Sequence, residues 1–248
     1  EIAEHFADAV EKGFRESPQV DLESLSDYEQ MKNKLSMEVV SAEKNAELLE
    51  SVPHERMEDM AVVYRFVLDQ TDSGNGTILV TNQLLDQYGI TKEQLRADAM
   101  ENAPEIRPSE IRGMSEVMSE LAPGMIPEVA PEDEQMFVAT VPDKIHGAGV
   151  IAYPNFMEDA AEKMGGDFFV LPSSIHEVLL VKDNGQMTAK ELENMVKEVN
   201  ATQVEPADQL TDHVYHYDSQ NHIFELADKY EERQREAEHD APDKDSVL

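Results

Sequence analysis

The stretch that decides the fold is AVVYRFVL at residues 61–68, followed by DQTDSGNG at 69–76 and TILVT at 77–81. Both flanking runs are rich in β-branched, aromatic and aliphatic residues, which favour strands. The residues between them are mostly the Asp, Ser, Gly and Asn that favour turns. The sequence therefore predicts a β-hairpin with a long loop.

Further short apolar runs and helix signals surround this hairpin. Strands are expected over 35–40, 136–141, 149–153, 168–171, 178–181 and 214–218. Helices are expected over 82–88, 91–102, 109–121, 155–164, 188–200 and 223–238. Hairpins and isolated helices occur without a regular βαβ rhythm. We therefore expect an α+β fold, with a largely antiparallel (mixed) sheet and helices packed on it.

A change of composition divides the chain at residues 122–134 (APGMIPEVAPEDE). Three prolines and four acids predict a linker or a long surface loop there. It would separate an N-terminal helical and hairpin part, 1–121, from a C-terminal α+β part, 135–240, although both could form one compact unit. Residues 241–248 are expected to be a disordered tail. The chain starts at Glu1 on a helical apolar stripe, so we expect further sequence to precede it.

The chain is strongly acidic, with 53 Asp+Glu against 20 Lys+Arg in 248 residues and a formal charge of −33. Acids outnumber bases in 1–60, 61–134, 135–206 and 207–248 alike, so the charge belongs to the whole surface. Such a surface repels nucleic acids and anionic membranes, and no apolar run is long enough to span a bilayer. We therefore expect a cytoplasmic protein that binds neither directly. The absence of cysteine excludes disulfides and thiolate chemistry.

The strongest catalytic candidate is the connection LPSSIHE at residues 171–177, between two apolar strands. The candidates for a hydrolytic site are His146, Asp167, Ser173, Ser174, His176 and Glu177. A nucleophile needs a base and an orienting group within hydrogen-bond reach, and neighbouring positions in sequence do not supply that geometry. The alternative is a tight turn whose serine hydroxyls satisfy backbone groups.

The metal candidates are His213, His216 and His222. His213 and His216 are three positions apart on an expected strand and face opposite sides. They would form a metal site only if the chain folds back toward His222. Gly147-Ala148-Gly149 lacks the third glycine and the following helix of a dinucleotide-binding loop. The sequence therefore predicts no cofactor.

Methionine is frequent, with 13 in the chain. Met114, Met118, Met125 and Met136 lie in and around residues 122–134. Methionine fills irregular cores and adaptable binding surfaces alike. We expect these four in the core.

Several runs, taken together, resemble a known family. They are ILVTNQLL (78–85), ADAMENAPEIRP (97–108), GAGVIAY (147–153), GDFFVLPSSIHEVLL (166–180), ELENMVKEVNAT (191–202) and DHVYHYD (212–218). Over about residues 60–235 the chain is similar to an uncharacterised bacterial family, the domain-of-unknown-function family 5688. The resemblance is weaker over the first sixty residues. It implies no activity and no catalytic residue; because relatives belong to genomes rich in conjugative elements, it favours an accessory role in mobile elements.

Two functions remain to be weighed. The first is a non-enzymatic protein that binds a macromolecular partner, in its sharpest form a nucleic-acid mimic that binds a basic nucleic-acid-binding protein. The second is a hydrolase-like enzyme with a site around residues 167–177. A purely structural role is a third reading, and the sequence does not indicate an oligomeric state.

Overall fold

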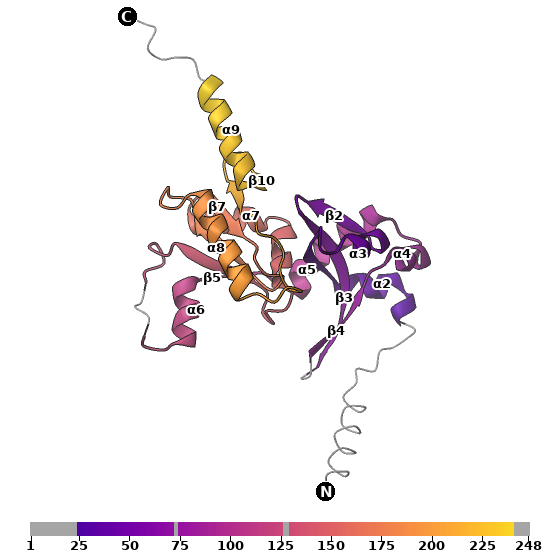
Figure 1. Ribbon diagram of the computed structural model, residues 1–248. Helices are drawn as coiled ribbons and strands as arrows, with labels where there is room; N and C mark the ends of the chain where they lie inside the picture. Colours follow the sequence, from indigo (N-terminus) through magenta and orange to yellow (C-terminus); the bar gives the residue numbers. More distant parts are fainter. Residues whose placement is uncertain (1–23, 72–73, 126–128, 241–248) are drawn as a thin grey trace, which may run out of the picture.

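Figure 1 shows the computed structural model, which describes residues 24–71, 74–125 and 129–240. Two antiparallel sheets with flanking helices confirm the expected α+β fold. The strands are β1 (Leu35–Ser41), β2 (His54–Met57), β3 (Met60–Thr71), β4 (Gly74–Leu79), β5 (Glu110–Gly113), β6 (Met136–Thr140), β7 (Phe168–Leu171), β8 (Val178–Lys182), β9 (Tyr215–Asp218) and β10 (Ile223–Leu226). The helices, with 3-10 helices labelled η, are η1 (Ser24–Ser26), α2 (Tyr28–Met31), η2 (Lys32–Lys34), α3 (Ala46–Ser51), α4 (Asn82–Tyr88), α5 (Lys92–Ile106), α6 (Met114–Leu121), η3 (Gly147–Ala152), α7 (Phe156–Met164), α8 (Ala189–Thr202) and α9 (Ala227–Asp240).

The first sheet is built around β3. Strand β1 pairs along one edge of β3, while β2 and then β4 pair along the other edge. The pairing of β3 with β4 confirms the expected hairpin, but the expected long loop over 69–76 is wrong, because β3 continues to Thr71 and β4 begins at Gly74. Every residue of β3 from Met60 to Tyr64 is buried, because α5 contributes to the core on one face and α3 to the core on the other. A strand that is covered on both faces has a nearly continuous apolar sequence.

The second sheet has the order β10-β9-β7-β8-β6-β5, and every neighbouring pair is antiparallel. One face, which includes Phe168 and Leu180, belongs to the main core together with residues of α7 and η3. The other face, which includes Phe169 and Val181, packs under α8. This sheet is therefore covered on both sides along its central strands.

Helix η3 lies where the two sheets meet, and the main core contains residues of both sheets. A Cβ atom on Gly149 would lie 2.2 Å from the carbonyl oxygen of Met37 in β1, so only glycine fits this approach. The strand expected over 149–153 is therefore wrong. A short buried apolar run does not distinguish a strand from a helix, and here the close approach to β1 decides the conformation.

Two expected helices begin instead with a strand. The helix expected over 109–121 starts with β5, and the helix expected over 223–238 starts with β10. Each strand pairs at an edge of the second sheet, and this pairing overrides the local helix signal. Because β5 precedes residues 122–134 and its partner β6 follows them, the second sheet takes strands from both sides of that segment. The division into domains stays a prediction.

Helix α9 extends away from the body of the molecule (Figure 1). The expected N-terminal helical stripe and the expected tail at 241–248 lie outside the described residues. In the ranges that the structure describes, no helix is long and apolar enough to cross a membrane.

Candidate functional site

His146 and His176 meet near the junction of the two sheets. The backbone N–H of His146 donates to Nδ1 of His176 at 3.2 Å, and the ring centroids lie 5.6 Å apart, edge to face. Nδ1 of His146 is 3.3 Å from Oε2 of Glu38, and Nε2 of His176 is 3.5 Å from Oδ2 of Asp208. His146 also has φ of 53°, an uncommon left-handed conformation for a residue other than glycine. The structure thus brings together two of the sequence candidates, each facing a carboxylate.

Glu38 is a buried carboxylate that the sequence analysis missed. Its side chain is 3% exposed, and its Oε2 accepts a hydrogen bond from Nε of Arg65 at 2.7 Å. Burial raises the pKa of Glu38, but the contacts with His146 and Arg65 outweigh burial and hold that pKa below its usual value. The available signal was a charged residue between Met37 and Val39 in an otherwise uncharged strand.

The hydroxyl of Ser174 and the backbone carbonyl of Ser173 each accept a backbone N–H. Oγ of Ser174 is buried and accepts the backbone N–H of His176 at 3.0 Å, while the carbonyl of Ser173 accepts the N–H of Leu210 at 3.2 Å. Nδ1 of His176 is occupied by the N–H of His146. In the part of the chain that the structure describes, no hydrogen bond joins a serine hydroxyl to an imidazole. This geometry fits a tight turn better than a nucleophile beside its base.

Asp167 and Glu177 do not join the serines. Oδ1 of Asp167 accepts hydrogen bonds from the backbone N–H and the hydroxyl of Ser219, at 2.9 and 2.6 Å. Glu177 is exposed and lines an open hollow of about 390 Å³ together with Ser174, His176 and Asp208. The six catalytic candidates are therefore not assembled into one nucleophilic site.

The three candidate metal ligands pair with three different carboxylates. His213 lies beside Glu193, His216 beside Asp183 and His222 beside Glu158, with nitrogen–oxygen distances of 3.6, 3.0 and 3.4 Å. They do not converge. Among the described residues, no group of three or more His, Cys, Asp or Glu side chains is placed to hold a metal ion.

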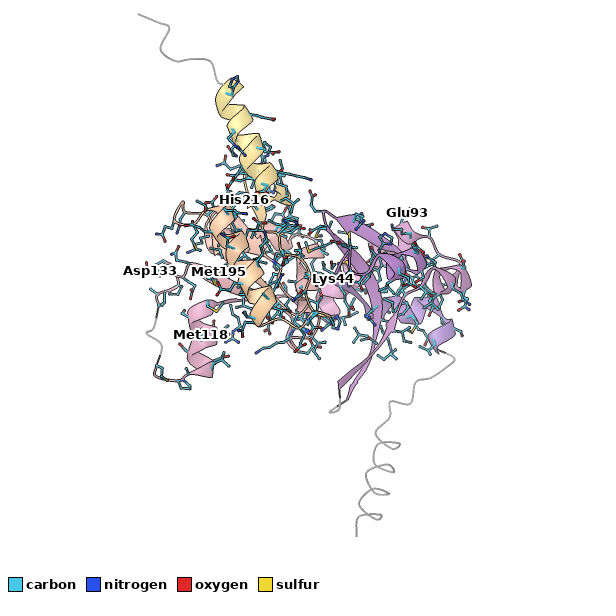
Figure 2. The ribbon with its side chains drawn as sticks, in the orientation of Figure 1. Lys44, Glu93, Met118, Asp133, Met195 and His216 are labelled. Atoms are coloured by element: carbon cyan, nitrogen blue, oxygen red, sulfur yellow. The ribbon has the colours of Figure 1, made fainter. Side chains whose placement is uncertain are left out.

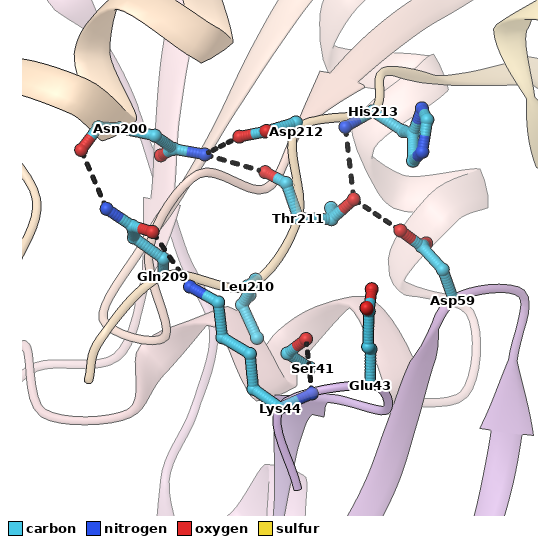
Figure 3. A pocket seen from close by; sticks show the side chains of 10 residues that line it. All are labelled: Ser41, Glu43, Lys44, Asp59, Asn200, Gln209, Leu210, Thr211, Asp212 and His213. Carbon is cyan, nitrogen blue, oxygen red and sulfur yellow. Dashed lines mark hydrogen bonds between the residues drawn. The ribbon is translucent and has the colours of Figure 1, made fainter. Parts of the chain in front are cut away.

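A polar cavity of about 500 Å³ lies between the first sheet and the segment that joins α8 to β9 (Figure 3). The first sheet and its turns contribute Ser41, Glu43, Lys44 and Asp59. The opposite wall consists of Asn200, Gln209, Leu210, Thr211, Asp212 and His213. Apart from His213, the sequence analysis did not identify these residues, because their proximity arises only when the two sheets pack together.

Two side chains fix the walls of this cavity relative to each other. Both carboxylate oxygens of Asp59 accept hydroxyl hydrogen bonds, one from Thr211 and one from Tyr215. Burial and then the hydrogen bond to Asp59 raise the pKa of Tyr215, so its phenol stays protonated and donates. Nζ of Lys44 donates to Oε1 of Gln209 at 2.7 Å. Side-chain hydrogen bonds across the junction therefore hold the shape of the cavity.

A second hollow, of about 280 Å³ and mainly apolar, lies beside α6, and we call it the α6 groove. Its apolar lining consists of Met114, Val117, Met118 and Leu121 from α6 and Val138 and Leu179 from the second sheet. No residue of α6 is buried, although one side of the helix is apolar. Figure 2 shows α6, with Met118 labelled, at the edge of the molecule.

Two exposed large hydrophobic side chains, Met118 and Leu121, line the α6 groove, and others lie in neighbouring segments of the chain. In the described ranges, the exposed large hydrophobic residues are Met118 (40%), Leu121 (76%), Met125 (81%), Val129 (38%) and Ile145 (43%). All of them lie in α6 or in the loops before and after β6. The expectation of a core position is therefore wrong for Met118 and Met125.

Polar contacts hold α6 in this position. The buried carboxylate of Glu134 accepts the backbone N–H of Ser115 at 3.1 Å and also its hydroxyl. Arg112 of β5 pairs with Glu116, at 2.9 Å, and with Glu120 on one side of the helix. The apolar side of α6 is left to line the groove.

The comparisons with known proteins identify a family but no activity. A family model described as a family of unknown function (DUF5688) matches residues 1–219, in agreement with the resemblance found in the sequence. The match includes the first sixty residues, where the resemblance is weaker. No curated protein and no solved structure matches the chain.

Proposed function

The chain belongs to this family of unknown function, and we propose that it binds a partner protein by taking an apolar, positively charged segment into the α6 groove. The observation that carries the proposal is that Met118 and Leu121, two of the exposed large hydrophobic side chains of the described residues, line one mainly apolar groove. Contiguous exposed apolar surface next to a groove is typical of an interaction site. The exposed apolar side of α6 is suited to receive a short amphipathic helix.

The charges around the groove favour a basic segment. Glu110 and Glu177 are part of its lining, and Arg112 is already engaged by two glutamates of α6, which leaves Lys144 as the other base of the lining. The formal charge of −33 adds long-range attraction for lysine and arginine. The same charge opposes a second copy of this chain as the occupant.

The methionines of the groove support adaptable binding. Met114 and Met118 have flexible, polarizable side chains that can adjust to apolar groups of different shape. Leu121, with 76% of its surface exposed, extends the same apolar surface. Burial of these side chains by a partner would supply the apolar part of the affinity.

Because the chain has no cysteine, a single labelled cysteine can test the proposal. Leu121→Cys carries an environment-sensitive dye at the groove, and Asn194→Cys on the exposed side of α8 is the matched control. We expect a short Leu/Lys amphipathic peptide to shift the emission of the dye at 121 to the blue, saturably, with no shift at 194. An equal response to a Leu/Glu peptide, or no response to either, would refute the proposal.

A second test removes the apolar surface itself. The double variant Met118→Gln/Leu121→Gln should weaken binding of the Leu/Lys peptide about tenfold or more, since two apolar contacts are lost. Both side chains are exposed, so the free energy of unfolding should change by less than about 0.5 kcal/mol. Unchanged peptide affinity in this variant would exclude the groove as the binding site.

The other readings stay predictions. A nucleic-acid mimic would also bind a basic protein, but through carboxylates alone, so its affinity should fall steeply with salt. Binding in the α6 groove should keep its apolar part at high salt. The hydrolase alternative gains no support from the hydrogen bonds of Ser173, Ser174 and His176. Cytoplasmic localisation and a role in mobile elements also stay predictions.

A further inference from the structure

We infer that Met118 is a site of reversible oxidation, and that conversion of its thioether to a sulfoxide prevents an apolar segment from binding in the α6 groove. The inference rests on the proposed function, because it concerns the regulation of the same groove. Met118 is 40% exposed and belongs to the lining of the groove. Met114 shares the lining but is only partly exposed, and Met125 is exposed but lies outside the lining.

The fold shields most methionines of the chain from an oxidant. All 13 lie in the described ranges. The buried ones are Met31, Met37, Met60, Met157 and Met164. Within these ranges only Met118 and Met125 are exposed, at 40% and 81%, and the others are partly exposed. Because susceptibility to oxidation follows exposure, an oxidant reaches Met118 and Met125 first.

Methionine sulfur is the expected target, since the chain has no cysteine and no thiol competes for the oxidant. With hydrogen peroxide the step transfers one oxygen and two electrons. A lone pair of the sulfur attacks one peroxide oxygen, and the O–O bond breaks as the S–O bond forms. The other oxygen takes up the proton of the transferred one and leaves as water. Methionine sulfoxide reductases reverse the change with two electrons from a thiol.

The exposure of Met118 directs the effect of oxidation to binding rather than to folding. A sulfoxide is polar, unlike the thioether from which it forms. In the free protein its oxygen can face water, because Met118 is exposed, so the folded state tolerates it. A partner that fills the groove removes this water, and a polar oxygen buried without a donor is unfavourable. Oxidation therefore lowers the affinity for an apolar segment and leaves the fold intact.

The lining of the α6 groove offers few donors to a new acceptor. Arg112 is engaged by two glutamates of α6, and the hydroxyl of Thr140 donates to the carbonyl of His176 at 2.8 Å. Lys144 is the remaining side-chain donor of the lining. Figure 2 shows Met118 on α6 at the edge of the molecule, where a partner would cover it. A sulfoxide at position 118 would then meet mainly apolar groups.

Two variants that each keep one exposed methionine isolate the effect. Met125→Leu keeps Met118, inside the lining, and Met118→Leu keeps Met125, outside it. Each whole protein is treated with hydrogen peroxide at the lowest dose that oxidises its exposed methionine, and peptide mapping by mass spectrometry locates the added oxygen. Calorimetric titration then compares the affinity for the Leu/Lys peptide of the proposed function before and after treatment of the same variant.

We expect peroxide to weaken peptide binding about fivefold or more in Met125→Leu, because apolar contact is lost, and less than about twofold in Met118→Leu. A methionine sulfoxide reductase with a thiol reductant should restore the affinity of treated Met125→Leu. The urea midpoint of treated Met125→Leu should equal that of the untreated variant. A lower midpoint would assign the loss of binding to unfolding and overturn the inference.

Two further results would overturn the inference and leave the proposed function standing. One is oxidation of Met118 no faster than that of the buried Met60. The other is equal peptide affinity of Met125→Leu before and after treatment. If the untreated protein does not bind the Leu/Lys peptide, the proposed function itself fails, and the inference fails with it.

Discussion

Replacement of Gly149 by alanine tests the close approach that joins the two sheets. A Cβ atom at position 149 would lie 2.2 Å from the carbonyl oxygen of Met37 and 3.0 Å from its carbonyl carbon. Ordinary van der Waals contact begins near 3.4 Å. Helix η3 would therefore have to move about 1 Å away from β1, which separates the atoms that form the shared core.

The cost of this movement can be estimated. Overpacking a well-packed core costs about 1–3 kcal/mol, and the upper end applies because a backbone carbonyl cannot rotate away. The preference of helices for alanine over glycine returns up to about 1 kcal/mol. The free energy of unfolding should fall by about 2 kcal/mol, which lowers the Tm of a chain of this size by roughly 4–8 °C.

Urea unfolding followed by circular dichroism measures this change. Gly76→Ala in β4 is the matched control, because its Cβ would lie 3.5 Å from Cβ of Leu68, an ordinary contact. The control should change the free energy of unfolding by less than about 0.5 kcal/mol. If Gly149→Ala and Gly76→Ala unfold at the same urea concentration, the tight contact between η3 and β1 does not exist.

Three further predictions concern the base of α9 and the response to pH. His216 is fully buried and stacks on Tyr230 with ring centroids 3.6 Å apart. The variant His216→Ala should therefore lower the free energy of unfolding by about 2–4 kcal/mol and speed amide hydrogen exchange along α9. Unchanged exchange would contradict the idea that this stack holds α9 in place. The variant Arg233→Met removes the ion pair with Asp218 (2.9 Å). Trypsin should then cleave α9 faster at the other basic residues of this helix, because the helix opens more often. Unchanged cleavage would show that other contacts hold α9. Burial raises the pKa of Asp218, but hydrogen bonds from Asn221 and the pair with Arg233 hold it at about 2, below its ordinary 3.8. The stability that this carboxylate contributes is therefore present above about pH 4 and lost as the pH falls toward 2, and Asp218→Asn should flatten that part of the curve of unfolding free energy against pH.

The fold was predictable where local signals and tertiary partners agree. The helix expected over 188–200 matches α8, which Thr188 caps in a full capping box, and the helix expected over 82–88 matches α4, which ends at Gly89 in a left-handed conformation. The strands β5 and β10 were not predictable in this way. Their residues also suit a helix, and only pairing with β6 and β9 makes them strands. Sequence patterns report local preference, which a distant partner can outweigh.

The candidate sites were less predictable than the fold. The run 171–177 places Ser174 and His176 close together, but their hydrogen bonds depend on His146 and on the backbone rather than on each other. Glu38 comes from the other sheet, so no spacing in the sequence relates it to His146. The α6 groove depends on the apolar residues Met114, Val117, Met118 and Leu121 of α6, which lie on one side of that helix. Whether that side is buried depends on what covers it, and a single sequence does not record this.

The negative charge of the chain accounts for how an apolar groove can stay exposed. Exposed apolar surface promotes association between copies of a protein. Two copies that each carry a formal charge of −33 repel, so the α6 groove can stay uncovered without self-association. A basic partner experiences the opposite force, since charge brings it to the surface and apolar contacts then hold it. An equally apolar but acidic segment would meet Glu110 and Glu177 at the groove and be repelled. In the binding that we propose, the charge would select which apolar segment binds, and the groove would supply the affinity.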